Sequence, residues 1–327
     1  HAVRSRISSR LDGPGSRLPS VRAQATTMGV SVSTVVEAYE RLAAEGVIAA
    51  RAGSGFYVTG PAAPLALAEM EPRLDRAVDP LWVSRQSLET PPGHLKPGCG
   101  WMPSDWLYHD GLRRGLRRMA RADAAHLVDY AGPLGLPALR QTLQRRAATL
   151  GIEASMEQLL LAESGTHAVD LICRFLLKPG DCVLVDDPSY FNYHAMLKAH
   201  QVQAIGIPYT HTGPDLQVFA SALQEYAPRL YITNAGLHNP TGAVLSATTA
   251  HRLLGLADRS ELIIIEDDIF ADFELRPAPR LAALDGLSRV IHVGSFSKAI
   301  SAASRCGYIA ARPDWIEALT DLKLATS

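Results

Sequence analysis

The segment LIIIED at residues 262–267 is followed by VIHVGSFSK at residues 290–298 and then by Arg305. Each of the two stretches begins with a run of apolar, mostly β-branched residues, and such runs are typical of strands buried on both faces of a parallel sheet. Asp267 closes the first run and Lys298 follows the second. Both chemical side chains therefore lie at the carboxyl ends of expected strands, where ligands bind in open α/β sheets.

The same alternation of apolar strands and helical stretches continues on both sides of this segment. Five further runs have strand composition and are separated by helical patterns: LLLAE (159–163), CVLVDD (182–187), AIGIPY (204–209), RLYITN (229–234) and CGYIAA (306–311). The pattern predicts an α/β domain, with a mostly parallel sheet covered by helices on both faces.

Asp267 and Lys298 together indicate a bound cofactor. A carboxylate at a buried strand end is costly unless it is paired, and the protonated pyridine nitrogen of pyridoxal 5'-phosphate (PLP) is a cation that would pair with Asp267. Lys298 offers an amine for an imine, while the surrounding hydroxyl groups and Arg305 suit a phosphate. Taken singly, Asp267 is equally explained as a cap of the next helix, and Lys298 as part of a solvated Ser/Lys turn.

Three upstream motifs fit the same cofactor. Asn239-Pro-Thr-Gly follows an expected strand and supplies an amide donor for a phenolic ring oxygen, although by itself it is simply a good turn. Ser164-Gly-Thr-His opens an apolar helix whose first N–H groups would bind phosphate, with a plain helix cap as the alternative. Tyr190, in DDPSYFNY, follows a strand end, where an aromatic ring either stacks on a flat cofactor or joins the core.

These motifs, in this order, resemble the fold-type I aminotransferases over roughly residues 80 to 327. The resemblance implies that PLP is the cofactor, with Lys298 as the catalytic Schiff-base lysine and Asp267 paired with the pyridine nitrogen. It further implies that Asn239 holds the ring oxygen and that Tyr190 stacks on the ring. Tyr130 matches a tyrosine that reaches the neighbouring subunit's phosphate, which implies a homodimer. The phosphate ligands implied on this chain are Thr166, His167, Ser295, Ser297 and Arg305.

Two departures from that family bear on activity. Its members usually carry a tyrosine two or three residues after the strand-end Asp, where this chain has Ile269 and Phe270. Loss of that hydroxyl should alter the pKa of the imine and weaken catalysis more than binding. Relatives also continue into a small C-terminal domain that bears an arginine for the substrate carboxylate, and we expect that this domain is lacking here.

The first 60 residues have a different character. They carry seven arginines against four acidic residues, whereas the rest of the chain carries 25 basic against 29 acidic residues. Helical patterns at 1–10, 20–28 and 31–45 surround the turn Gly29-Val30-Ser31, and such a short turn with glycine is typical of a helix-turn-helix. The segment VIAARAGSGFYVTG (47–60) predicts two short strands around a glycine turn, as in a wing. A small helical protein-interaction domain with a hairpin is the alternative.

The segment from LPSVRAQ to GSGFYV (18–58) resembles the winged helix of the GntR family. In that family the arginine of the second helix, the start of the third helix and the wing glycine touch DNA. Relatives commonly place arginines on the third helix where this chain has Val32 and Val36, so hydroxyl groups and apolar contacts, for example to thymine methyls, are left for base reading. The DNA-contacting residues implied here are Arg22, Ser31, Ser33, Thr34 and Gly53.

These features predict a winged helix over 1–60, a short linker over 61–80 and an aminotransferase-like PLP domain over 81–327. The four cysteines form no CxxC pair and lie mostly in apolar stretches, which favours buried thiols over a disulfide or metal framework. No apolar run reaches about 18 residues, so we expect no membrane partner and a bacterial cytoplasmic location, at the nucleoid when bound to DNA.

The two resemblances together are typical of MocR-type regulators. They imply a transcriptional regulator that binds double-stranded DNA and whose PLP on Lys298 senses an amine or amino-acid effector, or PLP itself. Two alternatives stay open at this point: a working aminotransferase with a vestigial DNA-binding segment, and a DNA-binding scaffold that holds no PLP.

Overall fold

The computed structural model describes residues 15–59, 80–89 and 100–326, together with residues 3, 12, 91 and 94. The chain divides into two compact units, His1–Ala77 and Val78–Ser327. The helix expected at 1–10 and the linker expected at 61–80 lie almost entirely outside the described residues, so their boundaries remain predictions.

The first unit is a winged helix-turn-helix. Helix α2 (Val21–Met28) begins at its cap Ser20 and ends at Gly29, which has a left-handed φ of 64°. Helix α3 (Val32–Ala44) is capped by Ser31, and the hairpin of β1 (Ile48–Arg51) and β2 (Gly55–Val58) forms the wing. Val35 and Tyr39, which follow helical spacing on α3, are buried in its small core, and Leu42 packs against it.

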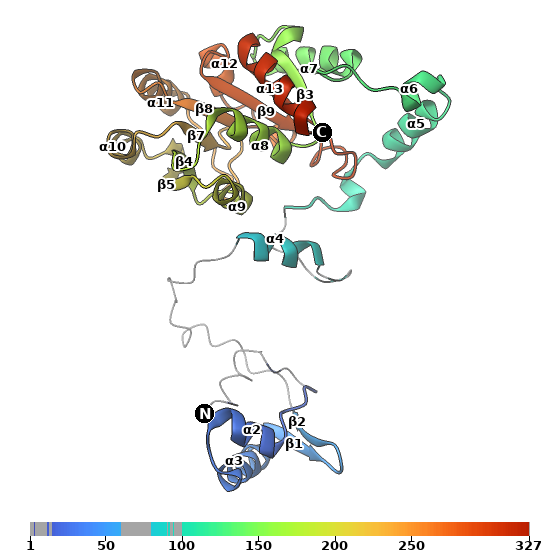
Figure 1. Ribbon diagram of the computed structural model, residues 1–327, viewed down its shortest axis with the longest axis vertical. Helices are drawn as coiled ribbons and strands as arrows, with labels where there is room; N and C mark the ends of the chain where they lie inside the picture. Colours follow the sequence, from blue (N-terminus) through green and yellow to red (C-terminus); the bar gives the residue numbers. More distant parts are fainter. Residues whose placement is uncertain are drawn as a thin grey trace. The chain divides into compact units, whose positions relative to one another are not determined.

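The second unit contains an eight-stranded sheet with the order β3-β10-β9-β8-β7-β4-β5-β6 (Figure 1). All seven expected strands are present, and each observed end lies within one residue of the expected one. Strands β7 and β10 are one residue shorter at both ends. Strands β4, β5, β7, β8 and β9 are parallel, and β10 runs antiparallel to both neighbours. The strands are β3 (Leu159–Ala162), β4 (Cys182–Asp187), β5 (Gln203–Thr210), β6 (Gly213–Pro214), β7 (Leu230–Thr233), β8 (Ile263–Asp267), β9 (Val290–Ser295) and β10 (Gly307–Ala310).

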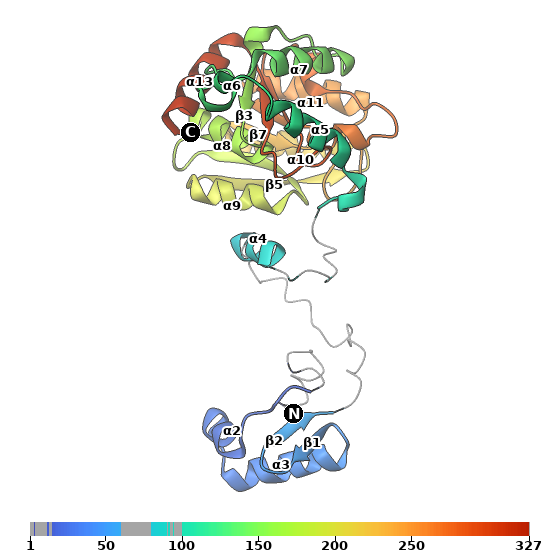
Figure 2. The same cartoon turned by 90° about the vertical axis from the view of Figure 1, so that its right-hand side faces the viewer.

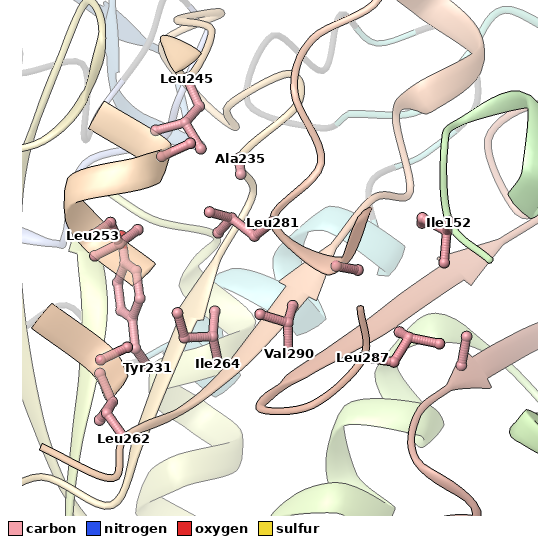
Figure 3. Close-up of a cluster of buried hydrophobic side chains, with 14 of the residues drawn as sticks. Ile152, Tyr231, Ala235, Leu245, Leu253, Leu262, Ile264, Leu281, Leu287 and Val290 are labelled. Atoms are coloured by element: carbon pink, nitrogen blue, oxygen red, sulfur yellow. The ribbon is translucent and has the colours of Figure 1, made fainter. Parts of the chain in front are cut away.

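Helices cover both faces of this sheet, as the continuous apolar strands predict. One buried cluster lies between the sheet and α7 (Pro137–Thr149), α10 (Leu216–Tyr226), α11 (Ala247–Arg259) and α12 (Leu281–Asp285), and Figure 3 shows its centre around Tyr231 and Ile264. The other lies under α8 (Gly165–Leu176), α9 (Phe191–Ala199) and α13 (Pro313–Thr326). Successive strand residues alternate between the two clusters, which holds the sheet rigidly in place.

Several short elements lie outside these two layers. Helices α5 (His109–Met119) and α6 (Ala124–Val128) are set apart from the helices that pack on the sheet (Figures 1 and 2). The others are α4 (Pro80–Glu89) and the 3-10 turns η2 (Ser104–Trp106), η3 (Met156–Gln158) and η4 (Ala271–Phe273). Within the described residues no helix combines the length and apolar character needed to cross a membrane.

The cysteines differ in part from the expectation of buried thiols. Cys173 is buried in α8, and burial raises the pKa of its thiol to about 12. Cys182 and Cys306 are only half-buried, because each lies at the end of a strand rather than in its middle. Cys99 lies outside the described residues.

Candidate functional site

The functional side chains of the large unit gather at one edge of its sheet. Strands β4, β7, β8 and β9 are parallel and end at this edge. Strand β10 runs the other way, so its first residue Gly307 lies there too, opposite Ser295 and Ala162. The topology therefore brings Tyr190, Asp267 and Ser295 to one edge, although they are far apart in the sequence.

Asp267 is buried at this edge, with 8% of its surface exposed. The Tyr193 hydroxyl donates to its Oδ2, and the backbone N–H of Ile269 donates to Oδ1 at 3.1 Å. Asn234 Nδ2 donates to its backbone carbonyl at 2.8 Å. Burial raises the pKa of Asp267, while the hydrogen bonds from Tyr193 and Ile269 oppose that rise. A cation beside this carboxyl group would favour its charged form.

The alternative role of Asp267 as a cap is partly realised, because Oδ1 accepts the N–H of Ile269 just ahead of η4. The second oxygen, Oδ2, is held by Tyr193 instead. A cap alone does not need a buried phenol donor on its far side. The arrangement is therefore that of a carboxylate held in a set orientation.

Two tyrosines at the start of α9 frame this carboxylate: Tyr190 is its N-cap residue, and Tyr193 lies on its first turn. The Tyr190 and Tyr193 rings meet edge to face, with centroids 5.5 Å apart. Tyr190 is half-buried, and burial together with the charge of Asp267 raises the pKa of its hydroxyl. Sequence reasoning singled out Tyr190 but missed Tyr193, although a second tyrosine one helical turn later was the available signal.

The start of α8 and the loop after β9 form a polar cradle. Ser164 caps α8 by accepting the N–H of His167 at 3.0 Å, and Thr166 is exposed. A side-chain carbon added at Gly165 would lie 3.5 Å from the Cβ of Ser295, so the two segments are adjacent. The Ser295 hydroxyl donates to Ser297 Oγ at 3.0 Å. Unpaired N–H groups of a first helical turn beside two hydroxyls suit a phosphate.

The cradle requires glycine where β10 begins. A Cβ at Gly307 would come within 2.7 Å of the backbone nitrogen of Gly165 and 2.4 Å of the carbonyl carbon of Ser164. Any other residue would push β10 away from the start of α8. Arg305, two residues earlier, is exposed and has a left-handed φ of 45°.

Lys298 lies in the loop after β9. Its Nζ donates to the backbone carbonyl of Gly100 and lies 5.9 Å from the centre of the Phe270 ring. Phe270 is half-buried, and Ile269 approaches Gly165 on the cradle side. The two residues that replace a tyrosine in this chain therefore lie beside the lysine and the cradle, where they offer apolar surface and no hydroxyl group.

Asn239 and Tyr130 complete the expected set. Asn239 is half-buried in the loop after β7. The residue before it, His238, stacks on Tyr209 with ring centroids 3.8 Å apart, and the His238 backbone carbonyl accepts the N–H of Gly242 at 2.7 Å. Tyr130 is fully exposed at the surface. Among the described residues, no hydrogen bond or ion pair joins Asn239, Arg305 or Tyr130 to the rest of the site. Their roles remain predictions.

The winged helix presents its expected DNA contacts on its surface. Arg22, Ser33 and Thr34 are exposed, and Gly53 in the wing turn is exposed with a φ of 70°. Arg51 lies over the Tyr57 ring at 4.4 Å. Apolar side chains at the start of α3 are also open to solvent: the exposed fractions of Val30, Val32 and Val36 are 42%, 49% and 37%.

Ser31 has a structural role beside its expected DNA contact. Its Oγ accepts the N–H of Thr34 at 3.1 Å and lies 2.8 Å from Ser33 Oγ. We expect Ser31→Ala to lower the free energy of unfolding of this unit by about 1 kcal/mol, because a helix loses its cap. Chemical denaturation measures this, with Ser33→Ala as the matched control and an expected change below about 0.5 kcal/mol. Equal losses in both variants would contradict the assignment of the cap.

Two family models match the chain. Residues 109–326 match the model described as aminotransferase class I and II, and residues 1–58 match the model described as bacterial regulatory proteins, gntR family. The HTH-type transcriptional regulator YdcR of Escherichia coli is 30% identical over 94% of this chain and 67% of its own length. The probable rhizopine catabolism regulatory protein MocR of Rhizobium meliloti is 27% identical over 91% of this chain and 61% of its own length.

The fold is similar to solved aminotransferases. The kynurenine aminotransferase of Pyrococcus horikoshii, solved in complex with PMP, superposes with a TM-score of 0.66 at 26% identity, over 70% of this chain and 58% of that protein. This chain therefore spans between 58% and 67% of the length of these proteins.

Proposed function

We propose that this chain, which belongs to the regulators of GntR/MocR type, is a PLP-dependent transcriptional regulator. Regulators of this type join a helix-turn-helix to an aminotransferase class I and II domain. In this proposal the winged helix binds double-stranded DNA, and the large unit holds PLP at the carboxyl edge of its sheet. An amine, an amino acid or PLP itself is the effector. The observation that carries the proposal is the buried, Tyr193-oriented Asp267 on the same edge as Lys298 and the cradle.

The donor set at this edge fits PLP. Burial raises the pKa of Asp267, and no ion pair joins this carboxylate to a residue that the structure describes. A protonated ring nitrogen would supply a cationic partner. The cradle of the α8 start, Ser295 and Ser297 suits the phosphate, and the half-buried Tyr190 beside Asp267 offers a ring face. PMP in the similar kynurenine aminotransferase is the amine form of the same cofactor, which supports this choice.

When bound, PLP would supply an aldehyde that reacts with amines and a cationic ring that accepts electron density. The chain's own residues then have separate tasks. Asp267 stabilises the protonated ring nitrogen, and Tyr193 keeps its oxygen aimed there. Lys298 supplies the amine that attaches the cofactor, and the hydroxyl groups of Ser295 and Ser297 help hold the phosphate.

Phe270 favours a regulator over an enzyme. Its ring lies beside Lys298 where relatives carry a phenol, so this position can neither donate a hydrogen bond nor move a proton. Cofactor binding uses Asp267 and the cradle, which are independent of that hydroxyl group. The arrangement therefore supports binding and exchange of amines more than repeated turnover. A transaminase that acts on amino acids is the second candidate, supported by the match over residues 109–326.

Exposed side chains on the outlying helices support a homodimer. Leu116 on α5 is 63% exposed, Val128 at the end of α6 is 76% exposed, and Tyr130 follows them at the surface. We call α5, α6 and the segment up to Tyr130 the arm. Exposed apolar groups of this size are typical of a surface that another protein covers. In our proposal a second copy covers this arm, so that Tyr130 reaches the partner's phosphate.

Replacing Tyr193 by phenylalanine tests how Asp267 is held. The variant keeps the ring and removes the hydrogen bond to Oδ2, so the pKa of Asp267 rises further and fewer molecules carry the charge that pairs with the ring nitrogen. We expect PLP to bind roughly 10-fold more weakly, which corresponds to the loss of one hydrogen bond to a charged group. A spectroscopic PLP titration measures this, with Tyr190→Phe as the control that keeps the Asp267 hydrogen bond. Equal affinity in the Tyr193→Phe variant and the wild type would contradict the assigned role.

One assay separates the proposed regulator from the transaminase. The PLP-loaded chain is incubated with a panel of amino acids and a keto-acid acceptor, and product is followed while DNA binding is measured on the same samples. We expect a spectral change on adding amines, at most a single equivalent of product, and a changed DNA affinity. Many turnovers with unchanged DNA affinity would favour the enzyme. A chain that takes up no PLP would overturn the cofactor assignment.

A further inference from the structure

Helix α5 carries an unusual concentration of positive charge. Five arginines occur within nine residues, at positions i, i+1, i+4, i+5 and i+8, and residues 111–122 contain no acidic residue. Four of them belong to α5, where a period of 3.6 residues places them on one face, opposite Leu112, Leu116 and Met119. The fifth, Arg121, lies in the turn just after the helix. All five are exposed. We call this set the arginine stripe: Arg113, Arg114, Arg117, Arg118 and Arg121.

Little within the described residues neutralises the arginine stripe. Arg113 lies 3.5 Å from Asp110, with both side chains more than two-thirds exposed, so this pair contributes little. Arg114 contacts the Tyr108 ring and hydroxyl. No ion pair joins Arg117, Arg118 or Arg121 to any residue that the structure describes. A concavity of about 520 Å³ lies among Arg114, Arg117, Arg118, Arg121 and Ala122.

This concentration of charge costs the helix stability. Like charges four residues apart on a helix, such as Arg113 and Arg117 or Arg114 and Arg118, each destabilise it by about 0.2–0.5 kcal/mol. The rest of the chain after residue 60 is acidic, with 25 basic against 29 acidic residues. The stripe therefore runs against the charge of its own domain, which points to a polyanionic ligand that offsets the repulsion.

The chemistry and length of the stripe fit a phosphate backbone. Guanidinium groups bind phosphate oxygens in a bidentate fork. The helix rises about 8 Å from residue 113 to residue 118, which matches roughly two base pairs along one DNA strand. Contacts to base edges would require α5 to enter a groove of the duplex. An exposed helix face can instead bind the phosphates of the DNA backbone from outside the grooves.

We propose that the arginine stripe is a second, sequence-independent DNA contact, which binds phosphates outside the segment read by the winged helix. This inference rests on the proposed function, because it requires that the chain binds DNA. It gives the large domain a direct part in DNA binding, beyond sensing an effector.

The test compares Arg117→Gln/Arg118→Gln with the matched control Arg252→Gln/Arg259→Gln, whose arginines are exposed on α11. DNA affinity of the full chain is measured against salt concentration on a duplex of about 20 base pairs, enough for two adjacent half-sites, and on one of about 50. On the longer duplex we expect the stripe variant to bind roughly 10-fold more weakly and its log–log salt slope to fall by about 2. The α11 control should match the wild type on both.

Three outcomes overturn the inference in distinguishable ways. An unchanged slope and affinity in a stripe variant that still binds DNA would reject the stripe while leaving the proposed function intact. An altered monomer–dimer equilibrium with an unchanged salt slope would assign the stripe to a second copy of the chain. Failure of the wild type to bind either duplex would reject the proposed DNA binding itself. Circular dichroism of each variant verifies that α5 remains folded.

Discussion

Lys298→Ala is expected to abolish the visible absorbance that the chain acquires with PLP. The alanine has no amine for covalent attachment, so only ionic and stacking contacts to the cofactor are left. Borohydride reduction of the loaded wild type should fix the cofactor on the peptide that contains Lys298, and mass spectrometry locates it. This is the largest effect that we predict, because the substitution removes the covalent attachment between the chain and the cofactor.

Lys198→Ala is the matched control, since Lys198 is exposed on α9 and lies away from the loop after β9. It should take up PLP as the wild type does. A reduced adduct on any lysine other than Lys298, or an undiminished band in Lys298→Ala, would refute the assignment.

Asp267→Asn is expected to weaken PLP binding by about 100-fold or more. Removing one partner of a buried ion pair costs about 3–5 kcal/mol, and tenfold in affinity corresponds to about 1.4 kcal/mol. The asparagine keeps the shape of the site but cannot stabilise a protonated ring nitrogen. Equilibrium titration of PLP measures the loss, with Asp258→Asn on the exposed face of α11 as control. A change of less than about threefold would show that Asp267 does not face the ring.

The same variant has a pH signature in the chain without PLP. Burial raises the pKa of Asp267 above its ordinary value of 3.8, so the folded state holds this proton more tightly than the unfolded state. The group therefore stabilises the fold below pH 3.8, and that contribution is lost as the pH rises through the folded pKa. As the pH rises from about 4, the stability of the wild type should fall relative to Asp267→Asn in chemical denaturation. A constant difference would contradict the raised pKa.

Much of the fold could be predicted because local composition and tertiary burial agree. The run 262–267 is apolar since β8 is covered on both faces, and the structure places β8 at Ile263–Asp267. The helical stretch expected from residue 31 begins where Ser31 caps α3 by accepting the Thr34 N–H. The direction of β10 could not be predicted, because CGYIAA has the same composition whether it pairs parallel or antiparallel.

The candidate site was predictable only where a motif marks it. Asp267 and Lys298 stand at strand ends in recognisable motifs, whereas Tyr193 is marked only by its spacing of one helical turn from Tyr190. Its role depends on the approach of β8 to α9 across 74 residues of sequence. Likewise, no local sequence pattern indicates the hydrogen bond from Lys298 to the backbone carbonyl of Gly100, which lies 198 residues away in the sequence. Such contacts are set by sheet order, which single-residue patterns do not encode.

The most direct test of a regulator that couples PLP chemistry to DNA binding is a footprint. DNA fragments selected by the chain itself are digested in its presence at fixed salt, with and without PLP and with PLP plus each amine of a panel. We predict that at least one of these additions changes the protected bases in the wild type and that none does so in Lys298→Ala. Identical protection in every sample, with PLP bound to the wild type, would contradict the coupling.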